Sequence, residues 1–142
     1  MRNLAILTMC FTATVGYAQD PTKELDKLNG TWMVSSAETG GTKIPNDVVK
    51  EFRLTIKDGT FIARLGADER KGTFRIDTTK KPMEMTIIVE TGTEKKAQLA
   101  IYDLQIGLLK ICLGDMEKME RPTDFETKSR PGSTLIVFAK AP

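Results

Sequence analysis

Carboxylates, serines and two cysteines are the side chains with which this chain could do chemistry, because its 142 residues include no histidine. Histidine is the commonest general base, the usual activator of a serine or cysteine nucleophile and the commonest transition-metal ligand. Cys112 therefore has no imidazole to activate it, and no serine lies in a Gly-x-Ser-x-Gly context. The sequence excludes hydrolase triads in their usual form and zinc sites built from cysteine and histidine.

The carboxylates form two groups that could supply an acid and a base, as in glycosidases. These groups are Asp68-Glu69, and Asp115, Glu117 and Glu120. Both lie in segments that read as polar turns, where a solvated surface is the more common arrangement. No stretch has the Asp-x-Asp-x-Asp-Gly spacing of calcium loops, and Met116 and Met119 read as ordinary loop methionines rather than copper ligands. We therefore expect a protein that is not an enzyme and that has no metal site and no cofactor.

The N-terminal 18 residues have the pattern of a secretory signal peptide. Met1-Arg2-Asn3 is a basic start, residues 4–15 are apolar and small, and Gly16-Tyr17-Ala18 places small residues at a cleavage site after Ala18. The apolar run is shorter than the roughly 20 residues that span a bilayer. Met9 is bulky where a lipoprotein signal needs a small residue before Cys10, so lipidation is not expected. The sequence predicts a periplasmic or secreted protein without a membrane span.

Residues 19–142 are enough for one domain with a single core. Their basic and acidic residues are nearly balanced and interspersed, which argues against nucleic acid as a partner because phosphate binding needs a clustered basic face. Cys112 is the only cysteine of this domain and has no internal disulfide partner. We interpret it as a buried cysteine of a strand.

Alternating apolar and polar residues predict about eight strands after a short helical lead-in over residues 20–28. The expected strands span residues 30–36, 52–57, 61–65, 72–77, 83–90, 96–104, 108–113 and 134–140. Short turns, including the hairpin signal Asp58-Gly59, imply antiparallel neighbours. Eight such strands can close into an up-and-down barrel, which leaves no exposed sheet edge. The fold class is therefore all-β.

One connection, residues 114–133, is too long for a structureless loop in a compact domain. It is expected to contain hidden structure or to have a role. Residues 121–126 are candidates for a short extra strand or a plug, with Phe125 as the apolar anchor.

Trp32 in the first strand is the expected structural keystone, because an inward indole buries about 200 Å² and sets the packing around it. Gly30 lies on the same face and leaves room for another segment close to the ring. Gly30-Thr31-Trp32 on the first of eight antiparallel strands resembles the lipocalin-like, or calycin, superfamily. That resemblance implies a lipocalin-like barrel for small apolar ligands and a basic side chain over the tryptophan. Lys140 or Arg121 would take that part.

A wider pattern is similar to an uncharacterised secreted domain family of planctomycete-type bacteria. It runs through Leu28-Asn29-Gly30-Thr31-Trp32, Ala100-Ile101-Tyr102-Asp103-Leu104, Leu109-Lys110-Ile111-Cys112, Arg121-Pro122 and Phe125. The resemblance covers nearly all of residues 19–142. Its fold does not by itself specify a function.

Two functions fit the barrel. In the first, a small apolar molecule binds inside it, and the long loop partly closes the mouth. The ligand would contact a face without charged residues, formed by Leu54, Phe61, Phe74, Met85, Ile87, Leu99 and Ile101. In the second, the same side chains fill the barrel, and the domain is a structural or protein-interaction module whose protein partners the sequence does not identify.

Overall fold

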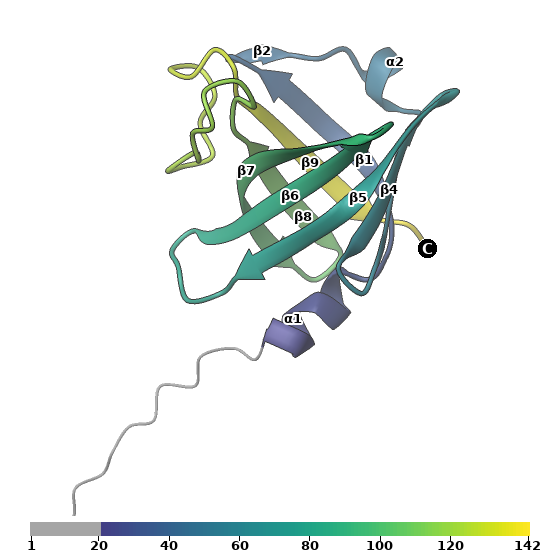
Figure 1. Ribbon diagram of the computed structural model, residues 1–142. Coiled ribbons are helices and arrows are strands. Elements are labelled where there is room, and N and C mark those ends of the chain that lie inside the picture. Colours follow the sequence, from purple (N-terminus) through teal and green to yellow (C-terminus); the bar gives the residue numbers. More distant parts are fainter. Residues whose placement is uncertain (1–20) are drawn as a thin grey trace, which may run out of the picture.

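The computed structural model describes residues 21–142 (Figure 1). The predicted signal peptide, its cleavage site after Ala18 and Cys10 lie outside the described residues. Within residues 21–142 no helix is both long and apolar enough to cross a membrane.

The described chain contains two short helices and nine strands. The helices are α1 (Pro21–Leu28) and α2 (Asn46–Val49). The strands are β1 (Gly30–Thr39), β2 (Thr42–Lys43), β3 (Phe52–Lys57), β4 (Thr60–Leu65), β5 (Asp68–Asp77), β6 (Met83–Thr91), β7 (Glu94–Gln105), β8 (Leu108–Leu113) and β9 (Thr134–Lys140).

Eight of these strands form a closed antiparallel barrel, which confirms the predicted fold class (Figure 1). From β3 to β9 each strand pairs with its successor in the chain, and β1 pairs with both β3 and β9. The two-residue strand β2 only extends a hairpin from the end of β1. Because the first and last strands meet, the barrel has no free edge along its length.

The β3–β4 hairpin shows how the sequence directs these turns. Asp58 and Gly59 both have positive φ, of 47° and 80°, as both central residues of a type I′ turn require. Asn29, between α1 and β1, fixes this turn, because its side chain bonds both the amide and the carboxylate of Asp58.

The helix α1 closes one end of the barrel. Leu28 is fully buried in the core and Leu25 packs against it. Trp32 is 1% exposed, and its Nε1 donates a hydrogen bond of 2.9 Å to the carbonyl oxygen of Leu28. The indole therefore joins the first strand to the helix that closes the barrel, in agreement with its expected place in the core.

Apart from the short strand β2 and shifts of one or two residues at strand ends, the structure differs from the predicted elements at three places. β1 continues to Thr39, because its far half pairs with β9 as well as with β2. β5 begins at Asp68, four residues earlier than expected, since its polar first residues pair with β4 across a turn of only two residues. Residues 121–126 form neither a strand nor a plug, and the long loop is held by side-chain bonds instead.

Candidate functional site

The barrel encloses a cavity of about 300 Å³ at the end away from α1. Its rim includes the exposed side chains of Leu65, Asp68 and Arg70, next to the β4–β5 turn. The other lining residues are mostly apolar and come from the seven strands β3 to β9: Phe52, Leu54, Ile56, Phe61, Ala63, Phe74, Met85, Ile87, Val89, Gln98, Ile111, Leu113, Ile136 and Phe138. An apolar cavity with few polar groups is the usual form of a small-molecule site.

Strand alternation directs these side chains inward. In β3, Leu54 and Ile56 are buried whereas the intervening Thr55 is exposed. In β5, Gly72 lies on the inward face, and a Cβ added there would overlap the carbonyl oxygen of Ile88 on β6. Only glycine therefore allows β5 and β6 to approach this closely at the cavity wall.

Five of the seven predicted ligand-contacting residues line the cavity: Leu54, Phe61, Phe74, Met85 and Ile87. Leu99 and Ile101 do not. In the β6–β7 register Gln98 lies opposite Ile87 and Ala100 opposite Met85, so Leu99 and Ile101, which alternate with these inward residues, point to the outer face. The prediction went wrong here because β7 carries apolar residues on both faces, so that alternation does not show which face is inward.

Sequence reasoning also missed the polar lining residues. Asp68 and Arg70 are at the rim, although the cavity face was expected to carry no charge. Both lie in a segment that was read as a turn, so their strand alternation was not considered. Gln98 also lines the cavity, and its amide nitrogen donates a bond of 3.0 Å to the carbonyl oxygen of Gly114.

A second buried cluster lies on the outer face, between the strands and the long loop. Ile101 and Cys112 are opposite each other in the β7–β8 register, both are buried, and neither belongs to the barrel core. Burial raises the pKa of the Cys112 thiol to about 11. The charges of Arg130 and Asp124, both in the long loop, also act on this thiol. Cys112 is thus a buried strand cysteine, as expected.

Arg121 attaches the long loop to the barrel wall. Its Nη1 donates to the carbonyl oxygens of Met85 (2.9 Å) and Ala100 (2.7 Å), one on β6 and one on β7. Its Nη2 bonds Thr86 Oγ1, and its Nε lies 3.4 Å from Glu84 Oε1. Arg121 is therefore a structural residue of the wall and does not cover Trp32.

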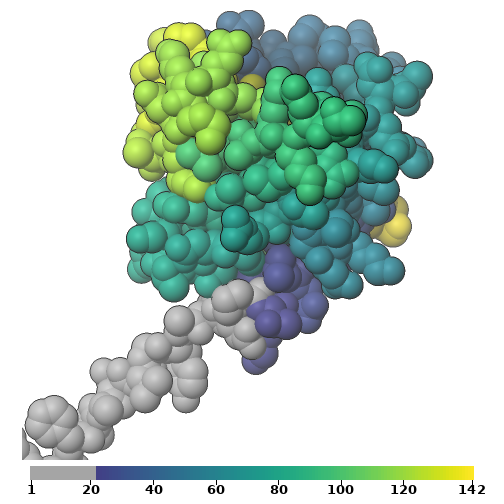
Figure 2. All heavy atoms as spheres, viewed as in Figure 1, coloured from purple at the N-terminus to yellow at the C-terminus, as the bar shows by residue number. Residues whose placement is uncertain are grey.

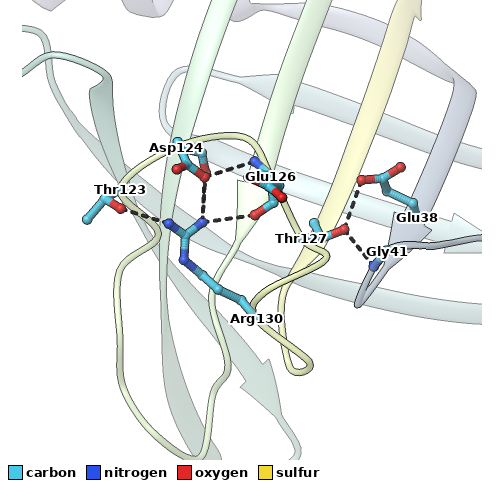
Figure 3. Close-up of polar contacts among 7 residues, drawn as sticks. All are labelled: Glu38, Gly41, Thr123, Asp124, Glu126, Thr127 and Arg130. Carbon is cyan, nitrogen blue, oxygen red and sulfur yellow. Dashed lines mark hydrogen bonds and ion pairs between the residues drawn. The ribbon is translucent and has the colours of Figure 1, made fainter.

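The rest of the loop is ordered by two further side chains (Figure 3). The guanidinium of Arg130 bonds Asp124 Oδ1 at 2.7 Å and the carbonyl oxygen of Glu126 at 2.9 Å. Thr127 is fully buried, donates to Glu38 of β1 at 2.8 Å and accepts from the amide of Gly41. These bonds join the loop to the β1–β2 hairpin.

The loop does not close the cavity. None of residues 114–133 lines it, and the loop forms a yellow-green lobe at one corner of the barrel in Figure 2. The expectation that it partly covers the mouth is therefore not met, because its bonds direct it along the outer face of β6 and β7 and toward β1.

A wider depression, of about 960 Å³, lies at the closed end of the barrel. Its walls include α1, the turn between β5 and β6, and the turn between β7 and β8, and they carry the lysines Lys27, Lys80, Lys81 and Lys140. The barrel cavity is the better candidate site, because apolar side chains from most strands converge on it.

Two observations complete the chemistry of residues 21–142. No group of three or more histidine, cysteine, aspartate or glutamate side chains within this range could hold a metal ion. The hydroxyl of Tyr102 is buried without a hydrogen-bond partner there, and burial together with the nearby Glu24 carboxylate raises the Tyr102 pKa.

No protein-family profile matches the sequence, and no curated protein matches it. Among solved structures, a DUF4847 family protein from Bacteroides vulgatus is similar at 17% sequence identity and a TM-score of 0.47. The match covers 78% of this chain and 92% of that protein.

Proposed function

We propose that this chain is an exported, non-catalytic, lipocalin-like domain that takes up a small apolar molecule inside its barrel. The observation that carries the proposal is the apolar cavity of about 300 Å³ within a closed antiparallel barrel. This volume is at the lower end of the range of about 300–1,000 Å³ that is typical of ligand sites, so the ligand is small.

The lining supports binding rather than catalysis. Among residues 21–142, Gln98 is the one polar lining residue below the rim, and its amide nitrogen is already bonded to the carbonyl oxygen of Gly114. A ligand that buries about 250 Å² of apolar surface would gain roughly 6 kcal/mol. The loss of translational and rotational freedom offsets part of that gain, so binding in the micromolar range or weaker is expected.

Export rests on the sequence of the first 18 residues. N-terminal sequencing of protein from the expressing cells tests it, and we expect the mature chain to begin at Gln19. A mature protein that starts at a modified Cys10, or one that keeps Met1, would contradict export with cleavage after Ala18.

Two tryptophan substitutions on β4 test uptake. Ala63 lines the cavity, whereas the adjacent Ile62 points outward and is 37% exposed. A tryptophan at position 63 would occupy the space of the ligand. We expect Ala63→Trp to lose uptake of an apolar fluorescent probe, and Ile62→Trp, which places the same indole on the other face, to keep it.

The readouts are probe fluorescence and thermal melting of both variants and of the wild type. Ligand binding predicts that Ala63→Trp melts close to the wild type, because the new ring fills empty space. If the folded wild type takes up no probe and Ala63→Trp is destabilised by about 1–3 kcal/mol, as expected for overpacking, the barrel is filled. The domain would then be a structural or interaction module.

A further inference from the structure

We propose that the ligand is a short amphiphile whose apolar tail occupies the barrel and whose anionic head group is bound by Arg70 at the rim. This inference rests on the proposed function and specifies its ligand class. It begins from the one arginine that lines the cavity.

Arg70 is on the inward face of β5. It lies opposite Ala63 of β4, which also lines the cavity, and it alternates with Gly72 and Phe74, which are buried on that face. Its neighbours in the chain, Glu69 and Lys71, are therefore directed outward. The guanidinium is placed at the entrance and not on the outer wall.

Among the described residues, the side chain of Arg70 has no internal partner. The same is true of Arg53 and Arg75, but these two occupy outward, exposed positions of their strands, so Arg70 is the unpaired arginine at the cavity. Arg64 bonds Glu69 at 2.7 Å, Arg121 is held by Glu84 and strand carbonyls, and Arg130 bonds Asp124 at 2.7 Å. Within residues 21–142 the side chain of Arg70 makes neither an ion pair nor a hydrogen bond. Its planar fork of donors matches a carboxylate or phosphate and is available to a ligand.

The charges around the mouth are arranged to favour an anion. The inward-facing carboxylates, Asp68 and Glu94, pair with Leu65 and Thr91 at the outermost ends of their hairpins.

Two cations lie deeper on the same faces. Lys96 is opposite Val89, which lines the cavity, and Arg70 is opposite Ala63. Both cations are thus one inward-facing position farther from the end of their hairpin, and so deeper in the barrel, than the carboxylate of their own strand. A head group that emerges from the cavity meets positive charge first.

The test compares three ligands with the same ten-carbon tail: decanoate, decanol and decyltrimethylammonium, each titrated at neutral pH into the mature chain. Decanol measures the contribution of the cavity alone. We expect the wild type to bind decanoate more tightly than the cation. Arg70→Gln should weaken decanoate about fivefold, a typical scale for one charge-assisted contact near solvent, and should leave decanol unchanged.

Lys71→Gln is the matched control, since it removes one positive charge from the adjacent, outward position of β5. We expect it to keep the wild-type ratio of decanoate to decanol affinity. Arg70→Glu should reverse the order and favour the cation. Melting temperatures establish that the variants are folded, and both altered side chains are exposed.

The outcomes separate this inference from the proposed function. If decanol binds and Arg70→Gln does not change the ratio of decanoate to decanol affinity, the inference of an anionic head group is wrong. The proposal of apolar binding then stands. A wild type that prefers the cation also contradicts the inference and would assign the head group to Asp68. If neither decanol nor decanoate binds to the folded protein, both proposals fail.

Discussion

The Nζ of Lys140 lies 5.5 Å from the centre of the Trp32 ring, so that the last strand places a cation over the aromatic residue of the first strand. Gly30 makes room for it, because a Cβ at that position would be 3.0 Å from Lys140 Cε. The φ of 132° at Gly30 also favours glycine. Lys140, and not Arg121, is therefore the basic residue next to Trp32.

Replacement of Trp32 should cost a large part of the stability of the domain. Trp32→Ala removes a buried indole and is expected to lower the free energy of unfolding by about 3–5 kcal/mol. Trp32→Phe should cost less, because it keeps an aromatic ring and loses mainly the bond to Leu28. Urea denaturation measures both changes.

Ile106→Ala is the control for Trp32, since Ile106 is fully exposed at the β7–β8 turn. It should change the free energy of unfolding by less than about 0.5 kcal/mol. If Trp32→Ala unfolded at the same urea concentration as this control, Trp32 could not be the keystone of the core.

The barrel was predictable because most of its strands bury one face, and alternation in β3 and β6 follows that face directly. β7 and the start of β5 were not predictable in the same way. The outer face of β7 is covered by the long loop, so Leu99 and Ile101 are apolar without facing the cavity. β5 begins with polar residues at a solvent-exposed hairpin, where no burial pattern marks Arg70 as part of a strand.

Gly72 should tolerate no side chain. Gly72→Ala would bring its Cβ against the backbone carbonyl of Ile88, which cannot move without displacing β6. We expect the free energy of unfolding to fall by about 1–3 kcal/mol or more. Gly92→Ala is the matched control, because Gly92 has a φ of 61° but open space around it, and it should lose only about 1 kcal/mol from backbone strain.

Thermal or chemical unfolding of the two alanine variants distinguishes these causes. Equal losses in both would mean that β6 relaxes away from the new methyl group. The close approach of the two strands would then have no energetic significance.

Arg121 should control access to Cys112. Arg121→Ala leaves the carbonyl oxygens of Met85 and Ala100 without this donor, at a cost of about 1–3 kcal/mol, and frees the loop that packs over the outer face. The rate at which a thiol reagent modifies native Cys112 should rise. Arg64→Ala is the control, because its exposed ion pair with Glu69 contributes at most about 1 kcal/mol and lies away from the loop.

An unchanged modification rate in Arg121→Ala, measured where the protein is fully folded, would show that other contacts hold the loop. The buried Thr127, bonded to Glu38 and Gly41, would be the next residue to replace.

Alkaline pH should destabilise the domain through Cys112 and Tyr102. Burial raises the pKa of Cys112 from 9.0 to about 11 and raises the pKa of Tyr102 above its ordinary 10.0. Below pH 9 both groups are protonated in the folded and unfolded states alike, so the contribution to stability is fully present. As pH rises further the unfolded chain loses these protons first, and each group lowers the free energy of unfolding by up to about 1.4 kcal/mol per pH unit.

Urea denaturation between pH 8 and pH 11 measures how the free energy of unfolding changes with pH. The wild type is compared with two variants, each of which lacks one of the two groups. Cys112→Ala should flatten the decline that begins near pH 9, and Tyr102→Phe should flatten only the part above pH 10.

Tyr102→Phe should also keep or increase stability at neutral pH, because it removes a buried hydroxyl without a hydrogen-bond partner. A loss above about 1 kcal/mol at neutral pH would mean that the hydroxyl is bonded in solution, and a decline unchanged in both variants would assign the alkaline sensitivity to other groups.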